Sequence, residues 1–344
     1  MMKRSSSKTF TLGDYHSSTA VIAGKKVISS PAFPNLEACH FEIGINSTTL
    51  INAQVGDHLV ITPQNSDAHV LKFAERFELD LNEEITNKNG VKLSTQEYLK
   101  KEADIFQLVN SRMMKKIIIF TSDHDEKEVL YDLEDFSKTH SIFDISMMFP
   151  SFGFKNVSQL IDFLPQIKPR YYSIGKVMLS TNEEEAKKFK KVISIVVANH
   201  KYETVIPKIE KTREGLTARF LNSITVGSEV EATLRKSTFK IPDSVKELKK
   251  PVLLIGNGAG LGPLVSFWLN LSESDKSNEG ERKFFGGVRD EKDYFEYKEK
   301  LGDSKSALFS YSRSGNKQHV QDMLKEKIQE EGPIKEWFNK VIEG

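Results

Sequence analysis

The hydrophobic and polar positions along the chain change their period three times. From residue 15 to residue 63, short β-rich segments alternate with glycine, asparagine and aspartate. This pattern predicts antiparallel strands, in a barrel or a sandwich, at Thr19–Ala23, Ala38–Ile45 and His58–Thr62. From residue 66 to about 167 the apolar positions recur at helical spacing, which predicts a mostly helical insertion.

Strand character returns in the second half of the chain, at Arg170–Ile174, Val192–Ala198 and Val230–Leu234. After Pro251, buried strands alternate with helical segments. We expect strands at 252–255, 283–287 and 307–312, and helices ending near 271 and spanning 291–301 and 317–331. Such alternation is typical of a parallel α/β sheet. In the helical part, the apolar run Lys116–Thr121 fits either a buried strand or a helix.

The chain has 344 residues with 49 basic and 48 acidic side chains, which gives a formal net charge of +1. This balance argues against a nucleic-acid-coating protein, which would show a strong basic excess. The single cysteine, Cys39, excludes an internal disulfide framework and a cysteine-based metal site, and we expect no metal. No apolar run approaches the roughly 20 residues that a membrane helix needs.

The N-terminal segment carries Lys3, Arg4 and Lys8 among serines, with no acid before Asp14. It weakly resembles a mitochondrial transit peptide, and a disordered polar start is the other interpretation. We predict an intracellular protein, with the cytoplasm as its location and the mitochondrion as the alternative.

A glycine-rich segment follows the first strand of the α/β part. Gly256, Gly258 and Gly260 let the backbone turn sharply, and Pro263 fits the first turn of a helix whose N–H groups favour a phosphate. The G-x-G-x-x-G spacing is not met, because Leu261 stands at the third glycine position. The segment predicts either a phosphate site or a tight turn without a ligand.

Three further segments combine residue types that bind charged or planar ligands. In Arg170–Ser173, the arginine suits a pyrophosphate, and the tyrosine and serine suit a planar ring. Gly215–Ala218 opens a short amphipathic helix with an anion-binding N-terminus. Ser312, Arg313 and Lys317 follow the last strand and suit a phosphomonoester. Taken singly, these segments also fit a strand start, a helix start and a solvated loop.

The order of these four motifs resembles the reductase half of the diflavin reductases, such as NADPH–cytochrome P450 reductase and the sulfite reductase flavoprotein. Supporting matches are Val55–Val60 and Phe284–Gly287, and the similarity spans about residues 36–338. The resemblance implies a ferredoxin–NADP reductase-like fold of the α/β plus β-barrel class.

The resemblance divides the chain into three parts. Residues 1–65 and 168–246 would form an antiparallel FAD-binding β-barrel, and residues 66–167 would form the mostly helical connecting insertion. Residues 247–344 would form a parallel α/β domain like the NADP-binding domain of the family, truncated at its C-terminus.

The resemblance also implies roles for single residues. Arg170 would hold the FAD pyrophosphate, Tyr172 would pack on the flavin, and Ser173 would approach flavin N5 as the catalytic side chain. Further FAD contacts would come from Gly215, Leu216, Thr217 and Ala218. NADPH contacts would come from Gly256, Gly258, Ala259, Gly260, Pro263, Ser312, Arg313, Lys317 and Gln321.

Several positions depart from the family pattern. Ala259 lacks the usual hydroxyl beside the nicotinamide, Gly262 replaces an alanine before the loop proline, and His319 replaces a tyrosine in the 2′-phosphate motif. The chain also stops at Gly344, before the Cys-Gly-Asp segment that the family places near the nicotinamide.

These features leave two functions open. The first is an FAD-dependent oxidoreductase that takes a hydride from NADPH and passes electrons to a separate acceptor, such as an FMN or haem protein. The second is a non-catalytic pseudo-reductase that serves as a structural or assembly subunit and retains FAD as a structural ligand. A truncated gene product or one half of a split enzyme would also explain the ending.

Overall fold

The computed structural model describes residues 18–132, 140–179, 188–203, 212–241, 251–274, 282–301, 306–330 and 332–343. Contacts within the chain divide it into two compact units. The first comprises residues 1–61, 171–198 and 225–344, and the second comprises 62–170 and 199–224. The basic, serine-rich start that resembles a transit peptide lies outside the described residues.

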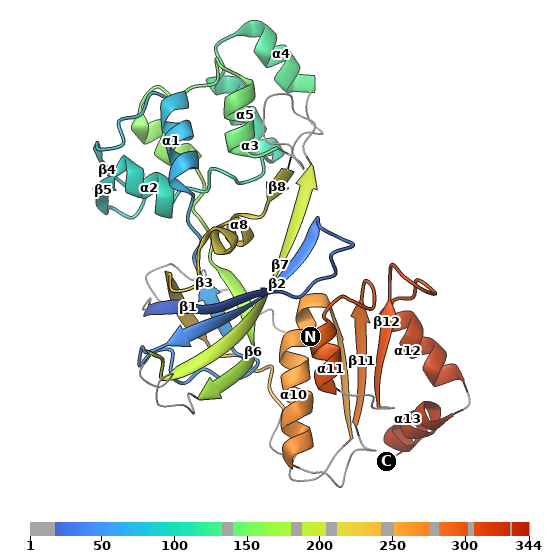
Figure 1. Ribbon diagram of the computed structural model, residues 1–344. Helices are drawn as coiled ribbons and strands as arrows, with labels where there is room; N and C mark the ends of the chain where they lie inside the picture. Colours follow the sequence, from blue (N-terminus) through green and yellow to red (C-terminus); the bar gives the residue numbers. More distant parts are fainter. Residues whose placement is uncertain are drawn as a thin grey trace, which may run out of the picture. The chain divides into compact units, whose positions relative to one another are not determined.

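Six antiparallel strands form a closed barrel (Figure 1). Hydrogen bonds connect them in the order β2-β1-β9-β3-β6-β7, and a further pairing between β2 and β7 closes the ring. Along β9 exposed and buried residues alternate, with Val230 and Ala232 buried, as a strand with one face on a core requires. The predicted barrel is therefore confirmed. The strands are β1 (Ser18–Val27), β2 (Leu36–Ile45), β3 (His58–Ile61), β6 (Arg170–Leu179), β7 (Lys191–Glu203) and β9 (Glu229–Arg235).

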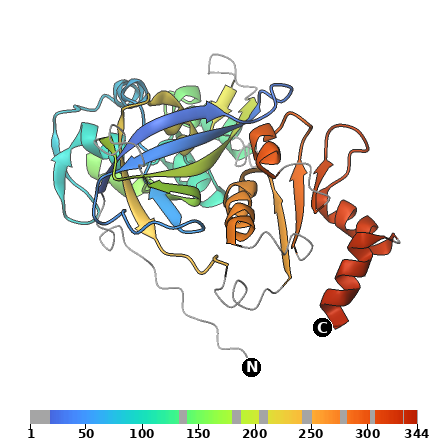
Figure 2. The same ribbon diagram turned by 60° about the horizontal axis from the view of Figure 1, so that its bottom comes forward.

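A parallel sheet in the order β10-β11-β12 occupies the C-terminal part of the first unit. Its strands are β10 (Val252–Asn257), β11 (Arg282–Val288) and β12 (Ala307–Tyr311). All seven residues of the central strand β11 are buried, because helices cover both faces of the sheet (Figure 2). The helices are α10 (Leu261–Ser274), α11 (Phe295–Leu301), α12 (Val320–Gln329) and α13 (Pro333–Glu343). The predicted α/β alternation is confirmed.

The helix predicted at 317–331 begins three residues later, at Val320. The residues before it form turns, in which Gly315 and Lys317 both have positive φ angles of 55° and 48°. His319 is the N-cap of this helix, and its backbone N–H donates to the carboxylate of Asp322. Left-handed residues cannot continue a helix, which explains the later start.

The barrel and the parallel sheet share one hydrophobic core inside the first unit. Ile28, Ala38 and Val196 of the barrel belong to the same buried cluster as Leu261 and Phe284 of the α/β part. Two backbone contacts reinforce it at the β1–β2 connection. The N–H of Tyr294 donates to the carbonyl oxygen of Ile28 (2.8 Å), and the N–H of Ser30 donates to the carboxylate of Asp293 (3.0 Å). The orientation of these two parts is therefore set by packing.

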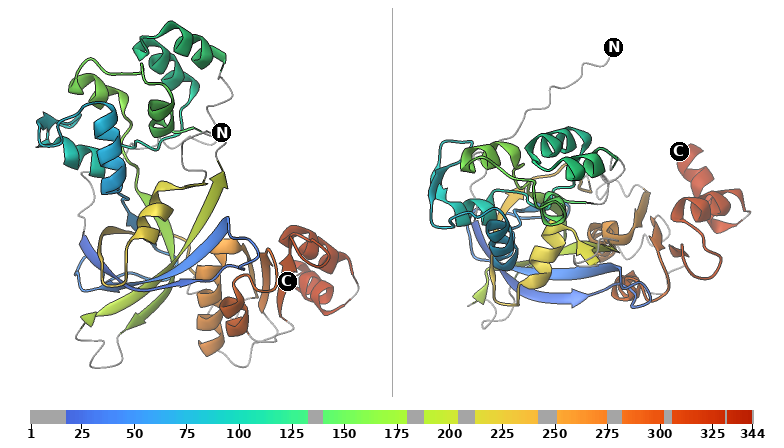
Figure 3. Two further views of the ribbon diagram at one scale, coloured as in Figure 1. Left: turned by 45° about the horizontal axis from the view of Figure 1, so that its top comes forward. Right: turned by 90° about the horizontal axis from the view of Figure 1, so that it is seen from above.

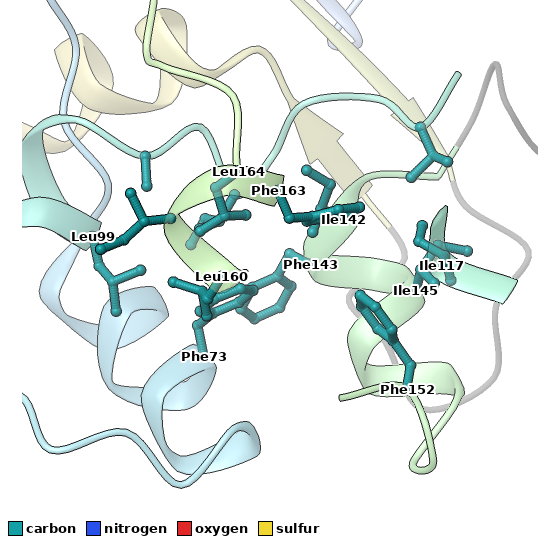
Figure 4. Close-up of a cluster of buried hydrophobic side chains, with 14 of the residues drawn as sticks. Phe73, Leu99, Ile117, Ile142, Phe143, Ile145, Phe152, Leu160, Phe163 and Leu164 are labelled. Atoms are coloured by element: carbon teal, nitrogen blue, oxygen red, sulfur yellow. The ribbon is translucent and has the colours of Figure 1, made fainter. Parts of the chain in front are cut away.

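The second unit is mostly helical, as predicted for residues 66–167 (Figure 3). Its core is rich in aromatic side chains, among them Phe73, Phe143, Phe152 and Phe163 (Figure 4). The run Lys116–Thr121, left open between strand and helix, lies at the end of helix α3, whose buried residues fall three and four positions apart. Its helices are α1 (Asp67–Arg76), α2 (Thr95–Lys101), α3 (Ser111–Phe120), α4 (His124–Asp132), α5 (Ile142–Met148), α6 (Val157–Phe163) and α8 (Leu216–Ser223). Its short strands are β4 (Glu84–Thr86), β5 (Lys92–Ser94) and β8 (Thr212–Glu214).

Candidate functional site

Strand β6 carries two of the predicted flavin contacts in the first unit. Tyr172 and Ser173 are half-buried, and the following residue, Ile174, is fully buried. Ile174 is held from both sides by the turn before β3. Its carbonyl oxygen accepts the N–H of Gly56 (2.9 Å), and its N–H donates to the carbonyl oxygen of Asp57 (2.7 Å). The position of Ser173 therefore depends on the Gly56–Asp57 turn.

Asp57 is fully buried and carries a charge. Its carboxylate accepts hydrogen bonds from the N–H groups of Gln54 (3.0 Å) and Ser237 (3.1 Å). It also forms ion pairs with the ammonium groups of Lys236 (3.1 Å) and Lys240 (2.8 Å). Burial alone would raise the pKa of Asp57, but these four donors outweigh it and hold the pKa below its ordinary value. The carboxylate thus connects the turn before β3 to the segment after β9.

The glycine-rich segment forms a tight connection from β10 to α10, as predicted. Gly258 has a φ angle of +51° and opens a single 3₁₀ turn that ends at Gly260. Ala259 is half-buried in that turn, and Pro263 is buried in the first turn of α10. No side chain caps the turn among the described residues. The N–H groups at the start of α10 therefore face the carboxyl end of a parallel sheet, where open α/β folds bind ligands.

The predicted phosphomonoester residues follow β12 at the same end of the sheet. Ser312 is half-buried, and Arg313, Lys317 and Gln321 are exposed. The guanidinium carbon of Arg313 lies 5.5 Å from the ring centroid of Phe33, in a cation–π contact that orients the side chain. The motif thus presents two exposed cations beside a serine hydroxyl, a combination that suits a phosphate monoester.

Arg170 lies in the second unit at the start of β6. It is exposed, and its guanidinium donates to the carbonyl oxygen of Lys168 (2.9 Å). The nearby carboxyl group of Asp104 is buried, which raises its pKa, although the charge of Arg170 and the N–H groups of Phe106 and Gln107 oppose the rise. One nitrogen of the guanidinium is therefore oriented by the backbone, and its charge is the largest of the influences that lower the pKa of Asp104.

Helix α8 in the second unit begins with an N-terminus that no side chain caps. Its N-cap is Gly215, which is exposed, and Leu216 is half-buried. Thr217 is only 5% exposed, and its hydroxyl has no hydrogen-bond partner among the described residues. Ala218 beside it is also buried. A buried hydroxyl without a partner costs free energy, so this helix start fits a polyanion such as a pyrophosphate.

Helix α8 and Arg170 contact the same segment of the second unit. The guanidinium carbon of Arg219 lies 4.2 Å from the ring centroid of Phe106. The N–H of Phe106 donates to Asp104, whose carboxyl group faces Arg170. Arg170 and the helix that begins with Gly215–Ala218 thus both interact with residues 104–106 of the second unit.

The remaining predicted contacts lie in the first unit, on β6, on the β10–α10 connection and after β12. The residues that motif reasoning left without a role are Gly56, Asp57, Lys236 and Lys240. Their signal in the sequence is a Gly-Asp pair before a strand and two lysines after another. The described residues contain no cluster of histidine, cysteine and carboxylate side chains that would hold a metal, and Cys39 is a buried thiol on β2.

In the described part of the chain, no helix is both long and apolar enough to cross a membrane.

Comparison with known proteins finds relatives over most of the chain. The FAD binding domain family matches residues 16–220. The mitochondrial pyruvate dehydrogenase (NADP+) of Euglena gracilis is 30% identical over 306 residues, which cover 82% of this chain and 16% of that protein. The NADPH–cytochrome P450 reductase of Emericella nidulans is 26% identical over 344 residues, which cover 83% of this chain and 48% of that protein. The NADPH-dependent diflavin oxidoreductase 1 of Mycosarcoma maydis is 32% identical over 178 residues, which cover 49% of this chain and 26% of that protein.

The chain spans less than half the length of each of these curated relatives. Among solved structures, a point mutant of the ferredoxin-NADP+ reductase from Plasmodium falciparum with 2′P-AMP matches with a TM-score of 0.50 and 16% identity. The match covers 95% of this chain and 85% of that one. At this identity the likeness concerns the fold alone, and it confirms the predicted ferredoxin–NADP reductase-like architecture.

Proposed function

The chain belongs to the FAD-binding domain family, in its NADPH-dependent diflavin reductase branch, and from this premise we propose that it is the module that oxidises NADPH. The family match and the NADPH-dependent relatives support FAD and NADPH as its cofactors. A separate FMN or haem protein would receive the electrons. A cytoplasmic location, with the mitochondrion as the alternative, stays a prediction.

We assign FAD binding to the barrel at 1–65 and 168–246 and NADPH binding to the α/β part at 247–344, with 66–167 as the connecting insertion. The observation that carries the FAD assignment is the start of α8. There a helix N-terminus without a side-chain cap coincides with the buried, unpartnered hydroxyl of Thr217. Gly215–Ala218 would donate to the pyrophosphate, and Arg170 would neutralise its charge.

Strand β6 would hold the isoalloxazine ring. Tyr172 would pack on the ring, and Ser173 would be the catalytic side chain, with its hydroxyl directed at the reacting nitrogen. Both are half-buried, so the strand offers them to a ligand without leaving them in bulk water. When bound, the flavin supplies the hydride acceptor, and the work of the chain is positioning and electrostatics.

The β10–α10 connection and the residues after β12 would bind NADPH. Gly256, Gly258, Ala259, Gly260 and Pro263 would approach the dinucleotide through the backbone. The hydroxyl of Ser312 and the charges of Arg313 and Lys317, with Gln321 beside them, would select the 2′-phosphate of NADPH over NADH.

Reconstitution with FAD tests the proposal directly. We expect the purified chain to bind added FAD and show a flavin absorbance band, and anaerobic NADPH to bleach that band faster than NADH does. Bound flavin that NADPH leaves unbleached would favour the non-catalytic pseudo-reductase, which retains FAD as a structural ligand. A chain that binds no FAD would contradict both functions.

Thr217→Val should separate FAD affinity from stability, because valine keeps the shape of threonine and removes its hydroxyl. Without FAD, the variant should be as stable as the wild type or more stable by about 1 kcal/mol, since no buried hydroxyl is left unpaired. Its FAD affinity should fall about tenfold, since a charged acceptor loses one donor. Denaturant unfolding and flavin fluorescence titration measure the two effects.

Thr121→Val is the matched control for this substitution. Thr121 is also buried in the second unit, but its hydroxyl donates to the carbonyl oxygen of Ile117 (2.8 Å). We expect Thr121→Val to lower stability by about 1 kcal/mol and to leave FAD affinity unchanged. Equal FAD affinity in wild type and Thr217→Val would refute the assignment of this hydroxyl.

A further inference from the structure

Gly175 occupies an irregular position in β6, two residues after Ser173. The pairing of β6 with β7 shifts register between Ile174 and Lys176, since these two residues face Ile195 and Ser194. Gly175 is thus the extra residue of a β-bulge. Bulges bend a strand locally and re-aim its side chains, and they are frequent beside active sites.

The backbone of Gly175 lies against the backbone of Gly262 in the first turn of α10. A Cβ added to Gly175 would lie 3.2 Å from the carbonyl carbon of Gly262 and 3.4 Å from its Cα and its oxygen. The 3.2 Å distance is tighter than ordinary van der Waals contact, and backbone atoms cannot rotate away as a side chain does. Only glycine at position 175 permits this approach without a shift.

The contact is not symmetrical. A Cβ added to Gly262 would lie 3.4 Å from a methyl carbon of Val196, 3.9 Å from the Cα of Gly175 and 3.9 Å from the hydroxyl oxygen of Tyr297. These distances are ordinary contacts, so the space around Gly262 accepts a methyl group. The two glycines therefore form a pair in which one position tolerates alanine and the other does not.

The core around the two glycines resists the displacement that an added methyl group at Gly175 would require. Leu261, beside Gly262, and Val196, on the neighbouring strand β7, belong to the core that joins the barrel to the α/β part. Leu261 is fully buried and Val196 is 9% exposed. A close-packed core resists rearrangement, so a methyl group at Gly175 would displace β6, the β10–α10 connection, or both.

We propose that the Gly175–Gly262 contact is a positioning contact that sets how closely the nicotinamide approaches the flavin. The inference rests on the proposed function and deepens it. One member lies two residues from the serine assigned to the flavin, and the other follows the glycine turn assigned to NADPH. Because the two backbones touch, the separation of the two cofactor sites is fixed here rather than by loops. Hydride transfer depends steeply on such geometry.

A graded series at position 175 tests the proposal in the full chain loaded with FAD. The rate of flavin reduction at saturating NADPH should fall about threefold in Gly175→Ala and about tenfold or more in Gly175→Val. The Kd for NADP+, measured by calorimetry, and the FAD content should stay within about twofold. The perturbation of the flavin absorbance by NADP+, an equilibrium signal, should weaken in the same order. Gly262→Ala should lose less of the rate than Gly175→Ala, and Gly153→Ala, whose added Cβ meets no atom within 4 Å among the described residues, should match the wild type.

Three results would overturn the proposal. The first is a wild-type rate of flavin reduction and a wild-type spectral perturbation in Gly175→Val. The second is a fall in the rate of flavin reduction in Gly262→Ala that is as large as the fall in Gly175→Ala. Loss of FAD from both Gly175 variants would show that the contact serves only stability. Failure of the proposed function would look different, because the wild type itself would bind no FAD. If the wild type binds FAD but NADPH does not reduce it, the spectral perturbation by NADP+ still decides whether the contact positions the two sites.

Discussion

Gly56→Ala is expected to lower the free energy of unfolding by about 3 kcal/mol or more and to weaken FAD binding. Gly56 has a φ angle of +82°, which a residue with a Cβ adopts only under strain. An added Cβ would also overlap the carbonyl oxygen of Phe239, which is backbone. The turn or the segment after β9 must then move. Because the N–H of Gly56 holds the carbonyl oxygen of Ile174, strand β6, to which we assign the flavin, would move as well.

Gly227→Ala is the matched control, in the same unit of the chain. Gly227 has a φ angle of +94°, but a Cβ added to it meets no atom within 4 Å among the described residues. This variant has the backbone strain without the steric overlap, and its free energy of unfolding should fall by about 1 kcal/mol. Denaturant unfolding of both variants, with FAD titration, makes the comparison. Equal losses would show that the close approach at Gly56 adds nothing to stability.

The sequence predicted the elements of this molecule better than their contacts. Alternation of buried and exposed residues is local, so strands such as β9 and the α/β order after Pro251 follow from the pattern alone. Closure of the barrel does not, because the pairing of β2 with β7 joins segments about 150 residues apart. Lys116–Thr121 stayed ambiguous because a run of only four apolar residues fits both periods, and only the core around α3 decides for helix.

In the candidate site, too, the sequence predicted local segments but not the contacts between distant ones. Motif order pointed to Arg170, Thr217 and Ser312, because each belongs to a short segment with a distinct composition. That the hydroxyl of Thr217 is buried and unpartnered depends on packing that no motif carries. The Gly175 bulge was missed for the same reason, since its requirement for glycine comes from a backbone 87 positions away in the sequence.

Asp57→Asn is expected to lower the free energy of unfolding at pH 7 by about 2 to 3 kcal/mol. Both carboxylate oxygens accept hydrogen bonds, one from Ser237 and Lys240 and the other from Gln54 and Lys236. An asparagine amide has only one oxygen, so its NH₂ group must face donors in either orientation. The loss stays below that of a fully buried pair because Lys236 is more than half exposed to solvent.

The pH dependence of this loss follows from the direction of the pKa shift. Because the folded pKa of Asp57 lies below its value in the unfolded chain, near 3.9, the carboxylate stabilises the fold fully above that pH. As pH falls through the folded pKa, the wild type takes up the proton and this stabilisation disappears. The difference between wild type and Asp57→Asn should therefore be largest at neutral pH and shrink below about pH 4. Unfolding curves from pH 3 to pH 7 measure it, with Glu231→Gln on the exposed face of β9 as a control for loss of one charge. That control should stay within about 0.5 kcal/mol of the wild type. A difference that stays constant over this pH range would mean that the shape of the side chain, and not its charge, holds the turn beneath β6.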